Sequence, residues 1–191
     1  MRKFFRDNPT IAFGLGLPVT LVLLFLLISG VPALLVESAQ YDVLYATNYN
    51  NYNNAPNGLQ ISVVGDRVQV NYLSNTQPYQ NPRLWRFSPK TGAVKEISLL
   101  LPPGPVPNVI PLNVPDLATL KVDSSSIAPD GYQFSTGADG YSGHVFTGMF
   151  YSSRYRYQAE LIKQGRSIRL PNTDGAFYGN TVRFIGWVVS P

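Results

Sequence analysis

The segment IAFGLGLPVTLVLLFLLISGVPALLV, residues 11–36, decides how the chain is organised. It contains 26 residues and no charged side chain. A helix crosses the hydrocarbon core of a bilayer, about 30 Å thick, with about 20 predominantly apolar residues. The sequence therefore predicts a single transmembrane anchor at residues 11–36, preceded by a short cytoplasmic N-terminus, residues 1–10.

Charged residues flank the predicted anchor unevenly. Arg2, Lys3 and Arg6 precede it, whereas Glu37 and Asp42 follow it. Basic residues beside a membrane span tend to stay on the cytoplasmic side. We therefore expect a single-pass protein of the bacterial inner membrane, with its N-terminus in the cytoplasm and its C-terminal domain in the periplasm.

A cleaved signal peptide is the alternative interpretation of this N-terminus. Signal peptides also begin with basic residues, but their apolar region is about 7–15 residues long and ends at small residues. The apolar run is longer here, and Glu37 interrupts the small-residue pattern that cleavage after Ala39 would need. These features favour an anchor that is retained.

Two glycines and a proline lie in the first half of the predicted anchor, at Gly14, Gly16 and Pro18. Small residues let helix backbones approach closely in lipid. A proline removes a backbone donor and leaves a carbonyl for a neighbour to cap. The three residues are our candidates for packing against a larger integral membrane subunit. The simpler explanation is that glycine and proline are common in membrane helices.

The remainder of the chain, about 150 residues, is long enough for one domain. The sequence holds 12 Tyr, 10 Phe, 16 Gly and 16 Pro, and only 14% charged residues. This composition favours strands and tight turns over helices. We expect residues 59–191 to form a mainly antiparallel all-β domain, a meander or sandwich with blade-like hairpins.

Two hairpins are predicted from alternating apolar residues on either side of turn residues. Gly65-Asp66 forms the first turn and Ser88–Gly92 the second. Their strands are Leu59–Val64, Arg67–Leu73, Leu84–Phe87 and Ala93–Leu99. The proline-rich segment Leu101–Asp116 is predicted to be an extended connection. Further strands are expected at residues 118–122, 132–135, 145–151, 154–162, 167–170 and 181–189.

Two surfaces are candidates for interaction. Residues 37–58 contain the Tyr/Asn-rich run YDVLYATNYNNYNNAPN and are predicted to be a linker between the anchor and the domain. The alternative is that this segment docks on a neighbour or on a glycan through Tyr49 and Tyr52. The last third of the chain is basic. Arginine and tyrosine alternate there and could contact acidic lipid headgroups or an acidic partner, or could form the solvated face of a hairpin. The candidates are Arg154, Tyr155, Arg156 and Tyr157.

The sequence offers little for catalysis or cofactor binding. There is no cysteine and a single histidine, His144, so a zinc site would depend on carboxylates. We expect no metal, no cofactor and no small-molecule substrate. Ser142 with His144 is the one conceivable hydrolytic pair, and a glycine-rich turn explains it better. Beyond residue 36 there are 12 basic and 10 acidic residues, a balance that does not suggest nucleic acid.

Two segments resemble the blades of propeller proteins. Leu84–Ile97 is similar to an outer blade hairpin with a Thr-Gly turn. Ile127–Phe134 resembles the Ser-Pro-Asp-Gly turn and strand of TolB-like repeats, with Ala128 in place of the serine. The resemblance implies blade-like hairpins, but the domain is too short for a closed propeller.

These observations lead to two expected functions. The first is a non-catalytic accessory subunit of a bacterial inner-membrane complex, whose helix packs on a larger subunit and whose β domain caps the periplasmic face. The second is a membrane-tethered binding module for a glycan, a peptide or a protein partner.

Overall fold

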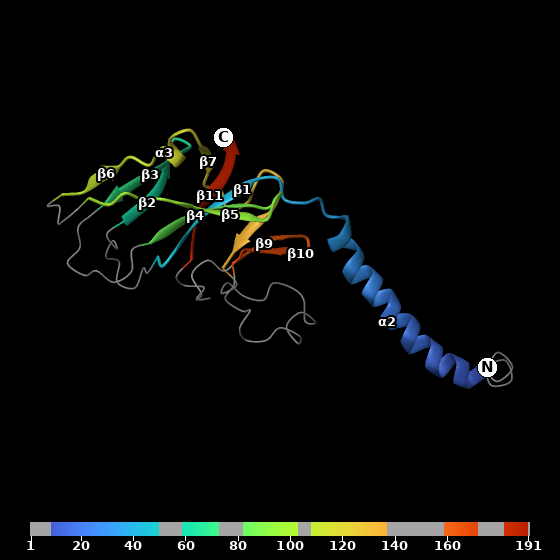
Figure 1. Ribbon diagram of the computed structural model, residues 1–191. Helices are drawn as coiled ribbons and strands as arrows, with labels where there is room; N and C mark the ends of the chain where they lie inside the picture. Colours follow the sequence, from blue (N-terminus) through green and yellow to red (C-terminus); the bar gives the residue numbers. More distant parts are fainter. Residues whose placement is uncertain are drawn as a thin grey trace. The chain divides into compact units, whose positions relative to one another are not determined.

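A computed structural model describes residues 9–49, 59–72, 82–102, 108–136, 159–171 and 182–190 of the chain (Figure 1). These residues form mainly antiparallel β sheets and one long N-terminal helix, which confirms the mainly β prediction. The chain divides into two compact units. One comprises Met1–Glu37 with Lys163–Arg166. The other, which we call the β unit, comprises Ser38–Ile162 with Ser167–Pro191.

The long helix α2 extends over 27 residues, Pro9–Leu35, and contains no charged residue. Proline suits the first turn of a helix because the amide hydrogen it lacks would have no partner there. The helix continues through Pro18, and the Thr20 hydroxyl donates a hydrogen bond of 2.8 Å to the Gly16 carbonyl. None of the helices in the described residues meets the combined requirement of length and mean hydropathy for a membrane span.

A five-stranded antiparallel sheet is the centre of the β unit, and its strand order is β5-β4-β1-β11-β7. Its strands are β1 (Asp42–Thr47), β4 (Arg83–Ser88), β5 (Ala93–Ile97), β7 (Lys121–Asp123) and β11 (Arg183–Ser190). The central strand β1 is buried at five of its six residues. A strand with nearly every residue buried is covered on both of its faces.

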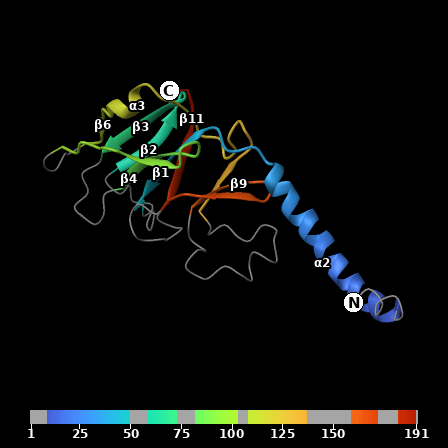
Figure 2. The same cartoon turned by 45° about the vertical axis from the view of Figure 1, so that its right-hand side comes forward.

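Two three-stranded sheets accompany the central one. The first has the order β2-β3-β6 and the second the order β10-β9-β8. Their strands are β2 (Leu59–Val64), β3 (Arg67–Tyr72), β6 (Ile110–Leu112), β8 (Gln133–Ser135), β9 (Glu160–Lys163) and β10 (Arg166–Arg169). A short helix, α3 (Pro115–Ala118), lies beside β3, and Figures 1 and 2 both show this arrangement.

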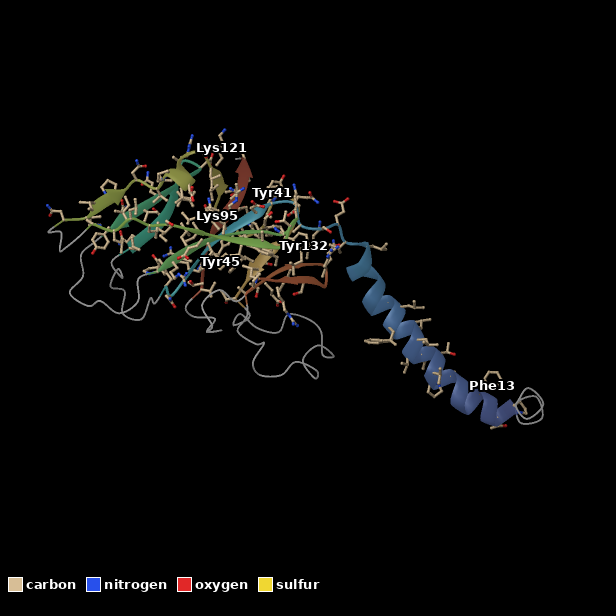
Figure 3. All side chains as sticks on the ribbon, in the orientation of Figure 1. Phe13, Tyr41, Tyr45, Lys95, Lys121 and Tyr132 are labelled. Atoms are coloured by element: carbon tan, nitrogen blue, oxygen red, sulfur yellow. The ribbon has the colours of Figure 1, made fainter. Side chains whose placement is uncertain are left out.

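Apolar packing on the two faces of the central sheet explains its burial. On one face, a core cluster includes Leu44 and Leu84 of the central sheet together with Ile61 and Val70 of the β2–β3 hairpin. On the other face, aromatic rings form a continuous row from β1 through β8 to β11. Successive ring centroids are 6.4, 5.2 and 5.2 Å apart, and the row consists of Tyr45, Phe134, Phe184 and Trp187. Figure 3 labels Tyr45 and Tyr132, which both lie within the β unit.

Hydrogen bonds order the segment that leads into β1. The backbone N–H of Gln40 donates a hydrogen bond of 2.7 Å to the Asp130 carboxylate. The same carboxylate accepts a hydrogen bond of 3.3 Å from the backbone N–H of Tyr132. Ala39 is only 1% exposed. The structure therefore differs from the predicted linker at residues 37–58, because residues 42–47 form the central strand of the sheet.

The proline-rich segment also differs from its prediction as an extended connection. Pro111 lies in β6, at the edge of its sheet, where a residue without an amide hydrogen is tolerated. Pro115 begins α3, which takes up part of the strand expected at residues 118–122. The hairpins around Gly65-Asp66 and Ser88–Gly92 form as predicted.

The two turns that resemble propeller blades are present. Gly92 donates a backbone hydrogen bond of 2.8 Å to Ser88, and Gly131 donates one of 2.8 Å to Ala128. Both glycines have positive φ, 70° and 87°. However, β4 and β5 belong to a five-stranded sheet, whereas a propeller blade is a four-stranded sheet.

Candidate interaction surfaces

Over residues 21–28, the lateral surface of α2 is apolar around its whole circumference. Eight consecutive residues, Leu21–Ile28, are each 47–65% exposed. Eight residues make more than two helical turns, so these side chains point in every direction around the axis. Phe13, 74% exposed, also projects from the helix (Figure 3). The helix thus has no polar side to present to water along this stretch.

The predicted helix-packing residues Gly14, Gly16 and Pro18 all lie in α2 and are exposed. An ideal Cβ added at Gly14 or Gly16 would meet no atom within 4 Å. Packing against the described residues of this chain therefore does not require glycine at either position. Pro18 supplies no amide hydrogen, so the carbonyl of Gly14, four residues earlier, lacks the helical hydrogen bond it would otherwise accept.

A second candidate surface lies where β1 ends and where β4 and β11 begin. Thr47 is opposite Arg83 on β4, and Ala46 is opposite Arg183 on β11. The register thus brings residues from three distant parts of the sequence to one end of the sheet. We call this set the strand-end cluster, and it consists of Thr47, Tyr49, Arg83, Trp85, Glu96 and Arg183.

Arg83 and Trp85 form the first half of the strand-end cluster. The indole nitrogen of Trp85 donates a buried hydrogen bond of 2.8 Å to the Thr47 hydroxyl. The Arg83 guanidinium lies 4.5 Å from the centroid of the same ring and makes a two-point contact with Glu96, at 2.7 and 2.6 Å. This arginine is therefore held in place by an aromatic face and a carboxylate.

Arg183 and Tyr49 form the second half. The Arg183 guanidinium lies 4.6 Å from the centroid of the Tyr49 ring. Tyr49, predicted to be a surface docking residue, is only 9% exposed and belongs to the hydrophobic core. Arg183 is the exposed member of the pair. The sequence analysis singled out Tyr49 but did not pair it with Arg183, because the two residues are far apart in the sequence.

We expect the contact between Glu96 and Arg83 to make stability depend weakly on pH. The hydrogen bond from Arg83 lowers the pKa of Glu96. A carboxyl group whose pKa is lower in the folded state than in the unfolded state stabilises the folded protein at pH values above its unfolded-state pKa. This stabilisation disappears as the pH falls through the folded-state pKa. Both side chains are 41% exposed, so Glu96→Gln should cost only about 0.5 kcal/mol at pH 7.

Urea unfolding of both proteins at pH 7 and at about pH 3 tests this expectation. The difference between wild type and Glu96→Gln should be present at pH 7 and absent at the lower pH. High salt at pH 7 should reduce it as well, because exposed charges are screened. An unchanged difference at both pH values would mean that the carboxylate charge is not its source.

The other candidate interaction residues lie outside the described residues, and so do Ser142 and His144, the pair that a glycine-rich turn explains better. These interaction candidates are Tyr52, Arg154, Tyr155, Arg156 and Tyr157. Among the residues that are described, no three histidine, cysteine, aspartate or glutamate side chains gather into a group that would hold a metal ion.

Comparison with known proteins identifies no relative. The chain matches no protein-family model, no curated protein and no solved structure. The fold itself defines the class, a mainly antiparallel β protein with one long N-terminal helix.

Proposed function

We propose that the protein is a non-catalytic accessory subunit of a bacterial inner-membrane complex, anchored by α2 as a transmembrane helix. In this proposal the N-terminus lies in the cytoplasm and the β unit caps the periplasmic face of a larger integral membrane subunit. The observation that carries the proposal is the uncharged helix α2, with apolar side chains exposed in every direction over Leu21–Ile28.

A helix that is apolar on all sides is either buried in a protein or surrounded by lipid. The described side chains of α2 are exposed within this chain, so burial would have to come from outside it. The 27 residues of α2 make a helix about 40 Å long at 1.5 Å per residue. This length matches the hydrocarbon core of about 30 Å plus part of the interfacial layers.

The first half of α2 has two features that favour packing against a helix of another protein. Gly14 and Gly16 have open space beside them, so another helix backbone could approach closely there. The Gly14 carbonyl, deprived of a donor by Pro18, is a group that a polar side chain of a neighbouring subunit could cap. Both features suit a helix that packs on another membrane protein.

Purification of the tagged full-length chain in a mild detergent tests the proposal. We expect other integral membrane subunits to co-purify in fixed proportion. Gly14→Leu combined with Gly16→Leu should remove those subunits, while Val22→Phe, a bulky change farther along the same helix, should retain them. Recovery of the wild-type chain as a clean monomer would overturn the role as a subunit.

A membrane-tethered binding module is the second candidate function, and the strand-end cluster favours it. Arg83 and Arg183 are each stacked on an aromatic ring, which orders a guanidinium before any ligand arrives. A glycan, a peptide or an acidic protein segment offers acceptors that such arginines bind. Retention of the full-length chain on a cell-wall glycan resin, and its loss in Arg183→Ala, would favour this function over the first.

A further inference from the structure

We propose that the β9–β10 turn, Lys163–Arg166, lies in the phospholipid headgroup layer where α2 leaves the bilayer, and that Lys163 and Arg166 contact anionic headgroups there. This inference rests on the proposed membrane-spanning role of α2. It adds a second attachment to the membrane, made by a basic turn that is distant from the anchor in sequence.

The first step in the argument is a contact at the end of the helix. The Arg166 guanidinium donates a hydrogen bond of 2.5 Å to the backbone carbonyl of Val36, one residue beyond the end of α2. The last carbonyl groups of a helix have no partner within the helix, and a basic side chain is well suited to them. Lys163–Arg166 accordingly belongs to the same compact unit as α2.

The second step concerns depth in the membrane. A helix of about 40 Å exceeds the hydrocarbon core and ends among the headgroups. Leu35, the last helical residue, is 78% exposed, whereas Val36 is only 7% exposed. A guanidinium bonded to the Val36 carbonyl therefore lies at the depth of the headgroup phosphates if α2 crosses the bilayer.

The third step concerns the shape and charge of the turn. Gln164 and Gly165 both have positive φ, 45° and 82°, which closes a tight two-residue hairpin turn between β9 and β10. Both residues are exposed, and Lys163 and Arg166 flank them without an acidic residue between. An arginine carries five N–H donors, so one guanidinium can bind several acceptors at the same time.

Acidic residues close to the turn in sequence, or shortly after the end of α2, limit how strongly anionic headgroups attract the turn. Glu37 follows the helix, and Glu160 on β9 accepts a hydrogen bond from Ser167. The basic residues Lys163, Arg166 and Arg169 outnumber these two acids by one. A basic residue close to an anionic bilayer surface contributes about 1 kcal/mol, roughly a fivefold change in occupancy, so the effect is measurable.

The chain has no cysteine, so a single cysteine can report the depth of any chosen residue. We would label Gln164→Cys with an environment-sensitive fluorophore in the full-length protein, reconstituted into vesicles. One set would contain only phosphatidylcholine, and the other would include about 30% phosphatidylglycerol. Headgroup spin labels should quench the fluorophore in both kinds of vesicle, because α2 sets the depth of the turn. The quenching should be stronger in the anionic vesicles, because Lys163 and Arg166 contact anionic headgroups only there.

Two further cysteines make the result interpretable. Leu24→Cys, in the middle of α2, should be quenched by spin labels on the acyl chains in both kinds of vesicle. Val109→Cys, an exposed residue of the β unit, gives a reference value for a residue outside the unit that contains α2. Lys163→Gln combined with Arg166→Gln should reduce headgroup quenching at Gln164→Cys toward the level found in neutral vesicles.

The outcomes separate the inference from the proposed function. If Leu24→Cys escapes acyl-chain quenching, α2 does not lie in the bilayer and both proposals fail. If Leu24→Cys is quenched but headgroup labels do not quench Gln164→Cys in the anionic vesicles, only the inference fails. Equal quenching of Gln164→Cys in neutral and anionic vesicles would also overturn it, since the proposed contact is with anionic headgroups.

Discussion

Gly186→Ala is expected to destabilise the β unit by about 1–3 kcal/mol, the usual range for overpacking a well-packed interior. An ideal Cβ on Gly186 would lie 2.4 Å from Cγ1 of Val122 and 2.7 Å from the backbone oxygen of Asp123. The Val122 side chain is fully buried and its neighbours leave it little room to move. The backbone of β7 would therefore have to shift away from β11.

A β-bulge explains why the two strands are so close at this point. Leu44 pairs with Gly186 while Tyr45 pairs with Phe184, so Ile185 is an extra residue on β11. Bulges bend a strand and increase its twist, and a glycine in a strand often marks such a bend or a close backbone approach. Gly186 fits this description, because β7 pairs with β11 next to it.

A double-mutant cycle identifies the cause of the loss. Gly186→Ala, Val122→Ala and the double variant would be unfolded with urea and followed by tryptophan fluorescence, since Trp187 is buried beside the site. The double variant should be less destabilised than the sum of the single variants, because Val122→Ala removes the nearest atom. The double variant should still show part of the clash, since the added Cβ also lies close to the Asp123 backbone oxygen, which Val122→Ala does not remove. Simple additivity would contradict the proposed clash.

The sequence predicted those parts of the fold whose signals are local. The β2–β3 hairpin was predicted from alternating residues around Gly65-Asp66, and both turn residues have positive φ, 55° and 60°. The β4–β5 hairpin was predicted from the turn that Gly92 closes. In each case the turn chemistry and the alternation lie within about 15 residues of each other, so no tertiary information is needed.

The central strand β1 was missed because tertiary packing determines it. Its residues DVLYAT are almost all buried, so they lack the alternation that marks a strand with one exposed face. The Tyr/Asn-rich composition that follows β1 then made the whole of residues 37–58 resemble a linker. β6 was missed for a related reason, since only its position at a sheet edge makes Pro111 acceptable.

The candidate surfaces were predicted to different extents. Gly14 and Gly16 belong to the same continuous apolar segment as the rest of the helix, so the sequence alone groups them, and the structure places them in one element. The strand-end cluster depends on the pairing of β1 with both β4 and β11, which no local pattern specifies. The contact between Arg166 and Val36 joins residues 130 positions apart, so it too required the folded chain.

Arginines introduced at the centre of α2 should remove the chain from the membrane if α2 is its anchor. Val22 and Leu26 lie four residues apart near the middle of the helix and are 58% and 59% exposed. An arginine at the centre of a membrane span costs about 2.5–3.5 kcal/mol on an insertion scale, so Val22→Arg with Leu26→Arg should cost about 5–7 kcal/mol. Each leucine favours membrane insertion by only about 0.3–0.6 kcal/mol, so two arginines offset most of the insertion free energy of the apolar run.

The fraction of chain that resists alkaline carbonate extraction from membranes measures this effect. We expect the double variant to move largely into the extract, while Thr10→Arg stays in the pellet because its charge is added at the N-terminal end of the helix and not at its centre. Helix propensity does not distinguish the substitutions, since arginine is a good helix former. A double variant that fractionates like wild type would show that lipid does not surround Leu21–Ile28, and another protein would then have to cover that surface.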